Sequence, residues 1–483
     1  MRYKSLLLYI LSFCLGMVTV YGYFRIKRHQ ERMLAVLAQA RFGLPSNDTV
    51  RIDSTNLPII LINTDGSLIS KEDYITAKMT IIDNGESKPN YADTIAYPDQ
   101  SFDYNGYIAL RFRGNSSFYE SDKKPYAIRS IDKPLEEGGV KKKCKLLGMR
   151  KGKKWVLLAP YSDRSMIRDA LAFELARNYM DFVPQTRFCE VILNGVYMGV
   201  HILSEQITAD RLKIGKPNHK GNDVTGGYLL EIDTRYKSPT VSMSWSMCEG
   251  SSEGRIPDSL ILNSPKKEDL TPEQKQYVLS TWNTLDKTMT SGSREEWLKV
   301  IDELSFIDFM LSKEFASDVD SYYISTFIYK ANDDVDNRFK VCLWDFNIAY
   351  GNCNYYDAHR TDVWNYKRVS LNWWAHMMED DGFRQRAKTR WSQYRRESYS
   401  WNNIENVIDS LTIVLTTGGA EARNSKAWKI WPPTGKEWHG AKYIWPNKYI
   451  SSSYADEIDY LKGWIKQRIV WMDEQLEYRQ NVN

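Results

Sequence analysis

The chain has 483 residues, of which 42% are hydrophobic and 26% charged, as in globular proteins with one large domain plus additions or with two to three domains. Its formal net charge of +4 is small for this length, so the overall charge does not favour nucleic acid as a partner. The six cysteines form no Cys-x-x-Cys pair and lie near no pair of histidines, which argues against a structural zinc site.

The first 30 residues predict a membrane segment. From Ser5 to Phe24 the chain is apolar and carries no charge, and it has about the length that a helix needs to cross a bilayer. No small-x-small cleavage site follows, so we expect an uncleaved anchor, with a signal peptide as the alternative. The basic residues after the segment favour a cytoplasmic body, whereas apolar N-terminal segments before a soluble domain most often serve export. We expect a membrane-anchored protein with an extracytoplasmic body in the cell envelope, and the cytoplasmic orientation stays open.

Residues 31–56 predict a stem, and residues 57–105 predict a small β-rich unit. A helical pattern ends at Leu44-Pro45, where the ring of proline disfavours helix in the residue before it. The runs 57–64 and 75–83 are rich in β-branched residues, and an Asp-Gly turn follows the first run.

Beyond residue 106 the pattern alternates between strands and helices. We expect strands at 107–113, 123–129, 155–159 and 226–233, a helix at 165–179, a hairpin of 188–193 with 197–203, helical structure from about 255 to 317, and a final helix at 454–478. Asn194-Gly195 between two apolar runs is the strongest hairpin signal. This order predicts an α+β fold with two lobes, in which 106–425 form the main domain and 426–483 pack on it.

A second predicted hairpin has the candidate catalytic residues at its ends. The runs 324–330 and 339–343 are β-branched and aromatic, and Asn332-Asp333-Asp334 provides a turn between them. Asp320 precedes the first run and Asp345 follows the second, so their carboxylates can converge on one point. Phosphotransferases hold a substrate hydroxyl and a metal ion with such a pair.

Several strings, taken together and in order, resemble the CotH kinase family. The strings are Arg113–Ser117, Lys123–Ile128, Trp155–Ala159, Tyr161–Arg168, Leu193–Val200, Ser204–Ile207 and Trp344–Asn347. The resemblance covers roughly residues 57–352. It implies an atypical protein-kinase-like fold that uses ATP with Mg²⁺ or Mn²⁺ to phosphorylate serine on protein acceptors.

The resemblance also implies roles for single residues. Asp320 matches the family's catalytic aspartate, and Asp345 matches its metal-binding aspartate. Asn347 is expected to complete the metal shell. Lys124 lies where a kinase-like lysine reaches the α and β phosphates, and its neighbour Lys123 is an equal candidate.

Three further residues complete the predicted site. Glu205 is a candidate partner for that lysine or for the metal, and Arg168 is a candidate phosphate contact. A protein kinase has an asparagine as second metal ligand five residues after the catalytic aspartate, where this chain has Ser325. A neutral hydroxyl is a weaker ligand, which places two-metal catalysis in doubt.

We therefore predict a CotH-type phosphotransferase acting on a serine or threonine of a protein acceptor, without a role for nucleic acid. The first alternative is a catalytically weak or inactive surface protein that binds a glycan or a protein partner. Its contact candidates are Trp344, Trp373, Trp374 and the loop 431–433. The second alternative is a metal-dependent phosphate-ester hydrolase using the same aspartates. A lysine cluster at 141–143 is interpreted as a solvated loop.

Overall fold

The computed structural model describes residues 43–86, 88–215, 223–233, 242–243, 259–368, 373–433, 436–438 and 441–479. The predicted membrane segment and residues 31–42 of the predicted stem lie outside the described residues. Within these ranges, every helix is too short or too polar to cross a bilayer.

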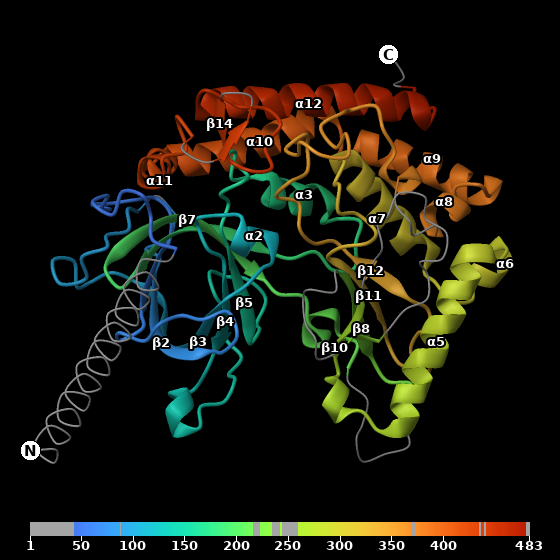
Figure 1. Ribbon diagram of the computed structural model, residues 1–483, viewed down its shortest axis with the longest axis horizontal. Coiled ribbons are helices and arrows are strands. Elements are labelled where there is room, and N and C mark those ends of the chain that lie inside the picture. The colour runs from blue at the N-terminus through green and yellow to red at the C-terminus, as the bar shows by residue number, and fades with distance from the viewer. Residues whose placement is uncertain are drawn as a thin grey trace, which may run out of the picture.

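The N-terminal half forms a closed β-barrel with the strand order β1-β2-β3-β4-β5-β7-β6 (Figure 1). The strands are β1 (Ile59–Asn63), β2 (Ile75–Ile82), β3 (Phe102–Phe112), β4 (Tyr126–Ser130), β5 (Lys154–Leu158), β6 (Thr186–Leu193) and β7 (Val196–Glu205). Neighbouring strands are antiparallel except β1 and β6, whose parallel pairing closes the barrel. The boundary predicted at residue 105 falls inside β3, and the strands on both sides of it share this barrel. The predicted hairpin around Asn194-Gly195 is confirmed as β6 and β7.

A second sheet has the strand order β12-β11-β8-β10-β9. Its strands are β8 (Tyr228–Asp233), β9 (Ser242–Met243), β10 (Ser259–Ser264), β11 (Thr326–Lys330) and β12 (Lys340–Cys342). The hairpin predicted between Asp320 and Asp345 is confirmed as β11 and β12, with Phe327 opposite Cys342. The helical prediction from about 255 is wrong for β10, which pairs with β8. Leu260-Ile261-Leu262 is a short apolar run, and periodicity alone does not separate a buried strand from a helix there.

The helices of the described residues lie mostly over the second sheet and one end of the barrel (Figure 1). They are α2 (Ser116–Tyr119), α3 (Arg168–Ala176), α4 (Ala209–Leu212), α5 (Pro272–Ser291), α6 (Arg294–Trp297), α7 (Glu303–Ala316), α8 (Trp373–Met377), α9 (Asp381–Arg396), α10 (Trp401–Thr416), α11 (Ala420–Trp428) and α12 (Tyr454–Gln475). Shorter elements are the 3-10 turns Leu135–Glu137, Lys267–Asp269 and Asn365–Lys367 and the hairpin of β13 (Lys436–Trp438) and β14 (Ala441–Tyr443). The predicted start of α5 is confirmed, because Thr271 caps the helix in a capping box with Gln274.

The helices α10, α11 and α12 run along the top of the molecule in Figure 1, where they lie over both the barrel and the second sheet. At the barrel, α11 packs directly on β7. Gly199 of β7 has a φ of +80°, and a Cβ there would lie 2.3 Å from Oδ1 of Asn424. Only glycine fits this contact. The α+β fold class is confirmed, while the kinase-like lobes stay a prediction.

Most of the aromatic residues named as sugar contacts belong to the core. Trp344, Trp373 and Trp374 have 4%, 0% and 0% of their surface exposed. The indole of Trp373 donates to Asp286, and that of Trp374 donates to the carbonyl of Phe306. These three side chains are not accessible to a glycan, so their assignment as contacts is wrong. The sequence suggested it because an aromatic residue in an apolar pattern is read equally well as a packing or a stacking residue.

Candidate active site

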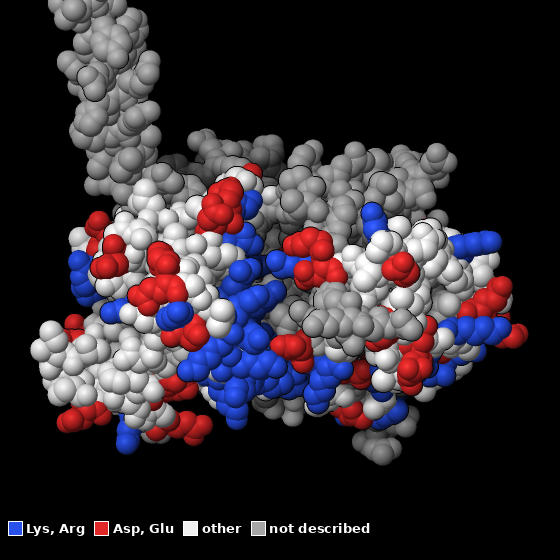
Figure 2. All heavy atoms as spheres, turned by 90° about the horizontal axis from the view of Figure 1, so that it is seen from below, with Lys and Arg blue, Asp and Glu red and all other residues white. Residues whose placement is uncertain are grey.

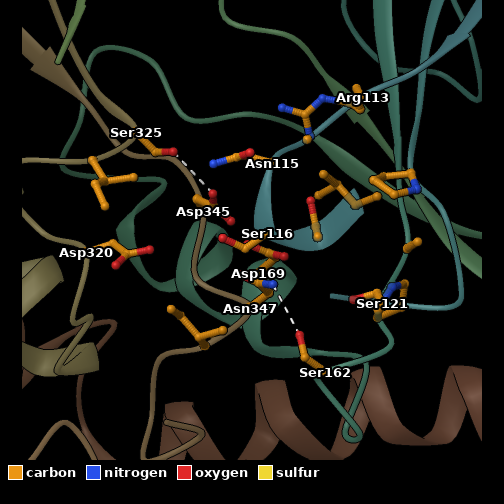
Figure 3. A pocket seen from close by; sticks show the side chains of 18 of the residues that line it. Arg113, Asn115, Ser116, Ser121, Ser162, Asp169, Asp320, Ser325, Asp345 and Asn347 are labelled. Atoms are coloured by element: carbon orange, nitrogen blue, oxygen red, sulfur yellow. Dashed lines mark hydrogen bonds between the residues drawn. The ribbon is translucent and has the colours of Figure 1, made fainter. Parts of the chain in front are cut away.

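A cavity of about 520 Å³ lies where one end of the barrel meets one end of the second sheet. From the barrel side it is lined by Arg113, Gly114, Asn115, Ser116, Ser117, Ser121, Pro125, Leu158, Ala159, Pro160, Ser162 and Asp169, and from the other side by Asp233, Asp320, Tyr323, Ile324, Ser325, Asp345, Asn347, Ile348, Tyr355, Tyr356 and Trp445. Figure 3 shows the labelled polar side chains of both groups pointing into this space. Its volume is within the range of small-ligand pockets.

The two hairpin aspartates converge in this cavity, as predicted. Asp320 lies between the end of α7 and the start of β11, and Asp345 follows β12. Since β11 and β12 are antiparallel, the start of one strand and the end of the other lie at the same end of the sheet. Both carboxylates line the cavity and keep part of their surface exposed to it.

A buried lysine holds the two aspartate segments together. Nζ of Lys313, on α7, lies 2.5 Å from the carboxylate of Asp318 and donates at 2.6 Å to the carbonyl of Trp344. Asp318 in turn accepts from the backbone N–H of Asp320. Lys313 and Asp318 are almost fully buried. One ammonium group thus fixes the backbone before Asp320 relative to the backbone before Asp345.

Ser325 lies directly beside Asp345. Its hydroxyl donates to Oδ2 of Asp345 at 3.2 Å, and its backbone N–H donates to Asp233. Ser325 and Asp345 have φ values of +49° and +63°, in the left-handed region that non-glycine residues rarely adopt. Such conformations cost about 1–3 kcal/mol each and cluster at functional sites. The surrounding contacts therefore stabilise an unfavourable backbone in order to hold these oxygen atoms in place.

Asn347 also reaches the cavity. Its Nδ2 donates to the hydroxyl of Ser162 at 3.3 Å, as the dashed line in Figure 3 shows. This hydrogen bond orients the amide and leaves Oδ1 as an acceptor. Together, Asp345, Ser325 and Asn347 present carboxylate, hydroxyl and amide oxygen atoms to one cavity.

Asp169, on the first turn of α3, adds a carboxylate that the prediction had not included. Its Oδ1 accepts the backbone N–H of Phe346 at 2.7 Å, which binds α3 to the residue next to Asp345. Burial, followed by the charge of Asp345, raises the pKa of Asp169 to about 8. Burial and the charges of Asp318 and Asp345 likewise raise the pKa of Asp320 well above its ordinary value. Burial is the larger cause of both pKa shifts and the neighbouring carboxylates add to it, so a cation among them would stabilise their charged forms.

Arg113 brings the opposite charge. Among the described residues that line the cavity it alone is basic, and its guanidinium lies over the ring of Trp344 at 5.7 Å. Burial lowers the pKa of Arg113, while the carboxylates of Asp345, Glu231 and Asp169 act to raise it. The adjoining Gly114 has a φ of +87°, and a Cβ there would lie 2.2 Å from Oγ of Ser117. Glycine at this position thus lets the loop 114–117 close tightly beside Arg113.

The two lysines proposed for the phosphates are not among the residues that line the cavity. Lys124 donates to the carbonyls of Phe118 and Ser121, and Lys123 donates to Asn424 and to the carbonyl of Val200. Both are buried, and the lining of the cavity includes neither. They precede β4 rather than lie on it, so strand alternation does not decide which one points inward.

Arg168 and Glu205 also lie outside the cavity lining, in networks of their own. Arg168 is fully buried between Asp163 at 2.6 Å and Glu457 at 2.8 Å. Glu205 accepts from Arg150 and from the backbone N–H of Gln185. Arg168 thus joins α3 to α12, and Glu205 joins the end of β7 to the segment before β5.

Arg113, Asp169 and Asp233 were missed, although each had a local signal. Arg113 begins the string Arg113–Ser117, and Asp169 directly follows the string Tyr161–Arg168. Both strings resemble the family. Asp233 ends a predicted strand, the same kind of position that singled out Asp345. Each of these charged residues lies near the end of a strand or the start of a helix. Only the fold shows that these positions surround one cavity.

The oxygen-only donor set fits a hard divalent cation. Within the described part of the chain no three His, Cys, Asp or Glu side chains are close enough to form a complete metal cage. Mg²⁺ takes one or two protein carboxylates and fills its other positions with water and substrate phosphates. Asp345, Asn347 and Ser325 would hold the metal, and Arg113 faces the same space.

Comparison with known proteins identifies the family of this chain. A search of curated proteins finds no match to the chain. A family model described as CotH kinase protein matches residues 110–472, most of the chain, including both hairpin aspartates and Asp169. The chain belongs to the CotH kinase family.

Proposed function

We propose that this protein is an ATP- and metal-dependent phosphotransferase that phosphorylates a hydroxyl group, in the first place serine, on a protein acceptor. The observation that carries the proposal is the convergence of Asp320 and Asp345 in one cavity that also holds Arg113. Membership of the CotH kinase family supports a kinase-like activity.

Asp320 takes the role of the base. It reaches the cavity with part of its carboxylate exposed, and its raised pKa makes it a stronger proton acceptor than a surface carboxylate. The backbone hydrogen bond to Asp318, itself held by Lys313, fixes its direction. Asp320 is thus suited to orient an acceptor hydroxyl and to take up its proton.

Asp345 takes the role of metal ligand, with Asn347 and Ser325 beside it. When bound, the divalent metal neutralises the negative charge of the phosphate oxygens. Ser325 is already hydrogen-bonded to Asp345 and is a weak neutral ligand. We therefore expect a single tightly held ion at Asp345.

Arg113 is proposed to contact the phosphates in place of the lysine expected from sequence. Guanidinium groups bind phosphate oxygens in a bidentate manner and stay charged when partly buried. The described contacts of Lys123 and Lys124 are with protein carbonyl and amide groups, which supports Arg113 for this role.

The test uses the purified full chain in nonionic detergent, with γ-labelled ATP, Mg²⁺ or Mn²⁺, and a library of serine peptides. Transfer of label to peptide or to the chain itself, and a thermal shift with nucleotide plus metal, are expected. Asp320→Asn should lower the rate of transfer roughly 10²–10⁴-fold, since it removes a general base. Asp345→Asn should abolish the metal-dependent part of the thermal shift.

Asp334→Asn is the matched control, because Asp334 is an exposed aspartate in the turn of the same hairpin. It should retain wild-type transfer. Unchanged transfer in both Asp320→Asn and Asp345→Asn would refute the proposal. Release of free phosphate without any labelled acceptor would assign hydrolysis instead.

A further inference from the structure

A strongly basic surface lies at the end of the barrel opposite the cavity. The segment 141–154, here called the basic loop, is the second part of the connection from β4 to β5 together with the first residue of β5. It contains Lys141, Lys142, Lys143, Lys145, Arg150, Lys151, Lys153 and Lys154 but no acidic residue, whereas the first part of the connection contains Asp132, Glu136 and Glu137. Figure 2, which views the molecule from below, shows Lys and Arg side chains gathered in a band across the middle of that face. The loop belongs to this underside because β4 and β5 point their Ser130 and Lys154 ends away from the cavity.

Carboxylates elsewhere in the described structure pair with part of this charge. Lys143 pairs with Asp210 at 3.3 Å, and Arg150 pairs with the buried Glu205. Lys142, Lys145 and Lys151 are exposed. The positive charge on this face is therefore concentrated, although the chain as a whole carries only +4.

The composition of the basic loop selects among polyanionic partners. It contains no aromatic residue on which bases or sugars stack, so a single-stranded nucleic acid or a glycan finds no platform. Leu146, Leu147 and Met149 are buried beneath the loop, which leaves them unable to insert into a lipid layer. Exposed lysines on flexible stems, acting as point charges, suit the mobile carboxylates of an acidic peptide.

We propose that the basic loop docks an acidic segment of the protein acceptor, and this assignment rests on the phosphotransferase function proposed above. The basic loop is continuous with a strand that leads to the cavity, because β5 starts at Lys154 and its last residue, Leu158, lines the cavity. Such a surface raises the local concentration of one class of acceptor near the catalytic aspartates.

The geometry sets a minimum spacing for the acceptor. Lys154, the last residue of the basic loop, and Leu158, which lines the cavity, are four positions apart in β5, which corresponds to about 13 Å along the strand. An extended peptide covers at most about 3.5 Å per residue. The acidic segment is therefore at least about four residues from the phosphorylated serine.

Binding of a fluorescein-labelled octaglutamate peptide to the full chain in nonionic detergent, measured by fluorescence anisotropy, tests the proposal. The wild type should bind octaglutamate but not octaglutamine, and added salt should weaken the binding. The triple variant K142Q/K145Q/K151Q should bind octaglutamate at least about tenfold more weakly, from the sum of several exposed charge pairs. K275Q/K287Q/K299Q, which removes three exposed lysines in and near α5, is the matched control and should bind like the wild type.

Two outcomes overturn the proposal. One is equal binding of octaglutamate by the wild type and the basic-loop variant. The other is more effective competition by a dT oligonucleotide, or by micelles containing phosphatidylglycerol, than by unlabelled octaglutamate. The nucleotide thermal shift of the same samples reports separately on the phosphotransferase function. If the wild type fails to bind octaglutamate but shows the nucleotide shift, the docking surface alone is refuted. If the wild type lacks the nucleotide shift, the function on which the acceptor role rests is refuted.

Discussion

Replacement of Arg168 by methionine separates the two roles considered for this residue. The sequence suggested a phosphate contact, whereas the structure buries its guanidinium between Asp163 and Glu457, with a further hydrogen bond from Nε to the carbonyl of Ala349. Burial lowers the pKa of Arg168, but the charges of Glu457 and Asp163 outweigh burial and raise it. Methionine keeps much of the side-chain volume and removes the charge.

The expected magnitude follows from the carboxylates left behind. The side chains of Asp163 and Glu457 are 1% and 3% exposed, so they would remain in the interior without the guanidinium that bonds to both of them. Breaking a buried ion pair from one side costs about 3–5 kcal/mol. Since domains are stable by only about 5–15 kcal/mol, Arg168→Met should lose a large share of its free energy of unfolding.

Urea unfolding followed by tryptophan fluorescence measures this loss. Arg187→Met, at an exposed arginine of β6, is the matched control and should change stability by less than about 0.5 kcal/mol. Adding Asp163→Asn and Glu457→Gln to Arg168→Met should restore part of the stability, because these changes remove the uncompensated charges. Nucleotide affinity of the folded fraction should stay unchanged. A loss below about 1 kcal/mol, together with weaker nucleotide binding, would refute the structural role and return Arg168 to the phosphate site.

Three further predictions concern other buried groups. Lys313→Met removes a charge that lowers the pKa of Asp320, so the acidic limb of the pH–rate profile should move to higher pH, and an unmoved limb would contradict the link. Gly199→Ala should destabilise the protein by at least about 1 kcal/mol in chemical denaturation, because φ at this position is +80° and the new Cβ would clash with Asn424 of α11. Unchanged stability would mean that α11 moves aside without cost. Burial, with the charge of Lys123, lowers the pKa of His201 well below 6.5, so the unfolded chain binds more protons and stability falls as the pH drops below 6.5. This loss is up to about 1.4 kcal/mol per pH unit, and stability curves at several pH values should show that His201→Gln lacks it.

Local patterns in the sequence determined several elements correctly. Asn194-Gly195 fixed the β6–β7 hairpin, and Thr271-Pro272 fixed the start of α5, because these residues form hydrogen bonds or backbone angles within a few positions of themselves. The convergence of Asp320 and Asp345 also followed from local information. A hairpin brings its two ends together whatever the rest of the fold does.

The remainder depended on contacts between distant segments. Pairing of β1 with β6, which closes the barrel, joins residues more than 100 positions apart, and no turn signal specifies it. Packing of α3 against the segment after β12 placed Asp169 beside the hairpin aspartates. The fold likewise placed Arg113 in the lining of the cavity, which does not include Lys124.

The sequence by itself thus determined the family, the hairpin and the two aspartates at its ends, because each is encoded by neighbouring residues. The tertiary structure alone decided which other charges meet those aspartates and which ones serve as buried ion pairs. The physical reason is that a charged residue type does not reveal its partner. Lys124, Arg168 and Glu205 carry the charges expected of a phosphate or metal site, but packing directs them to carbonyls, carboxylates and an arginine within the protein.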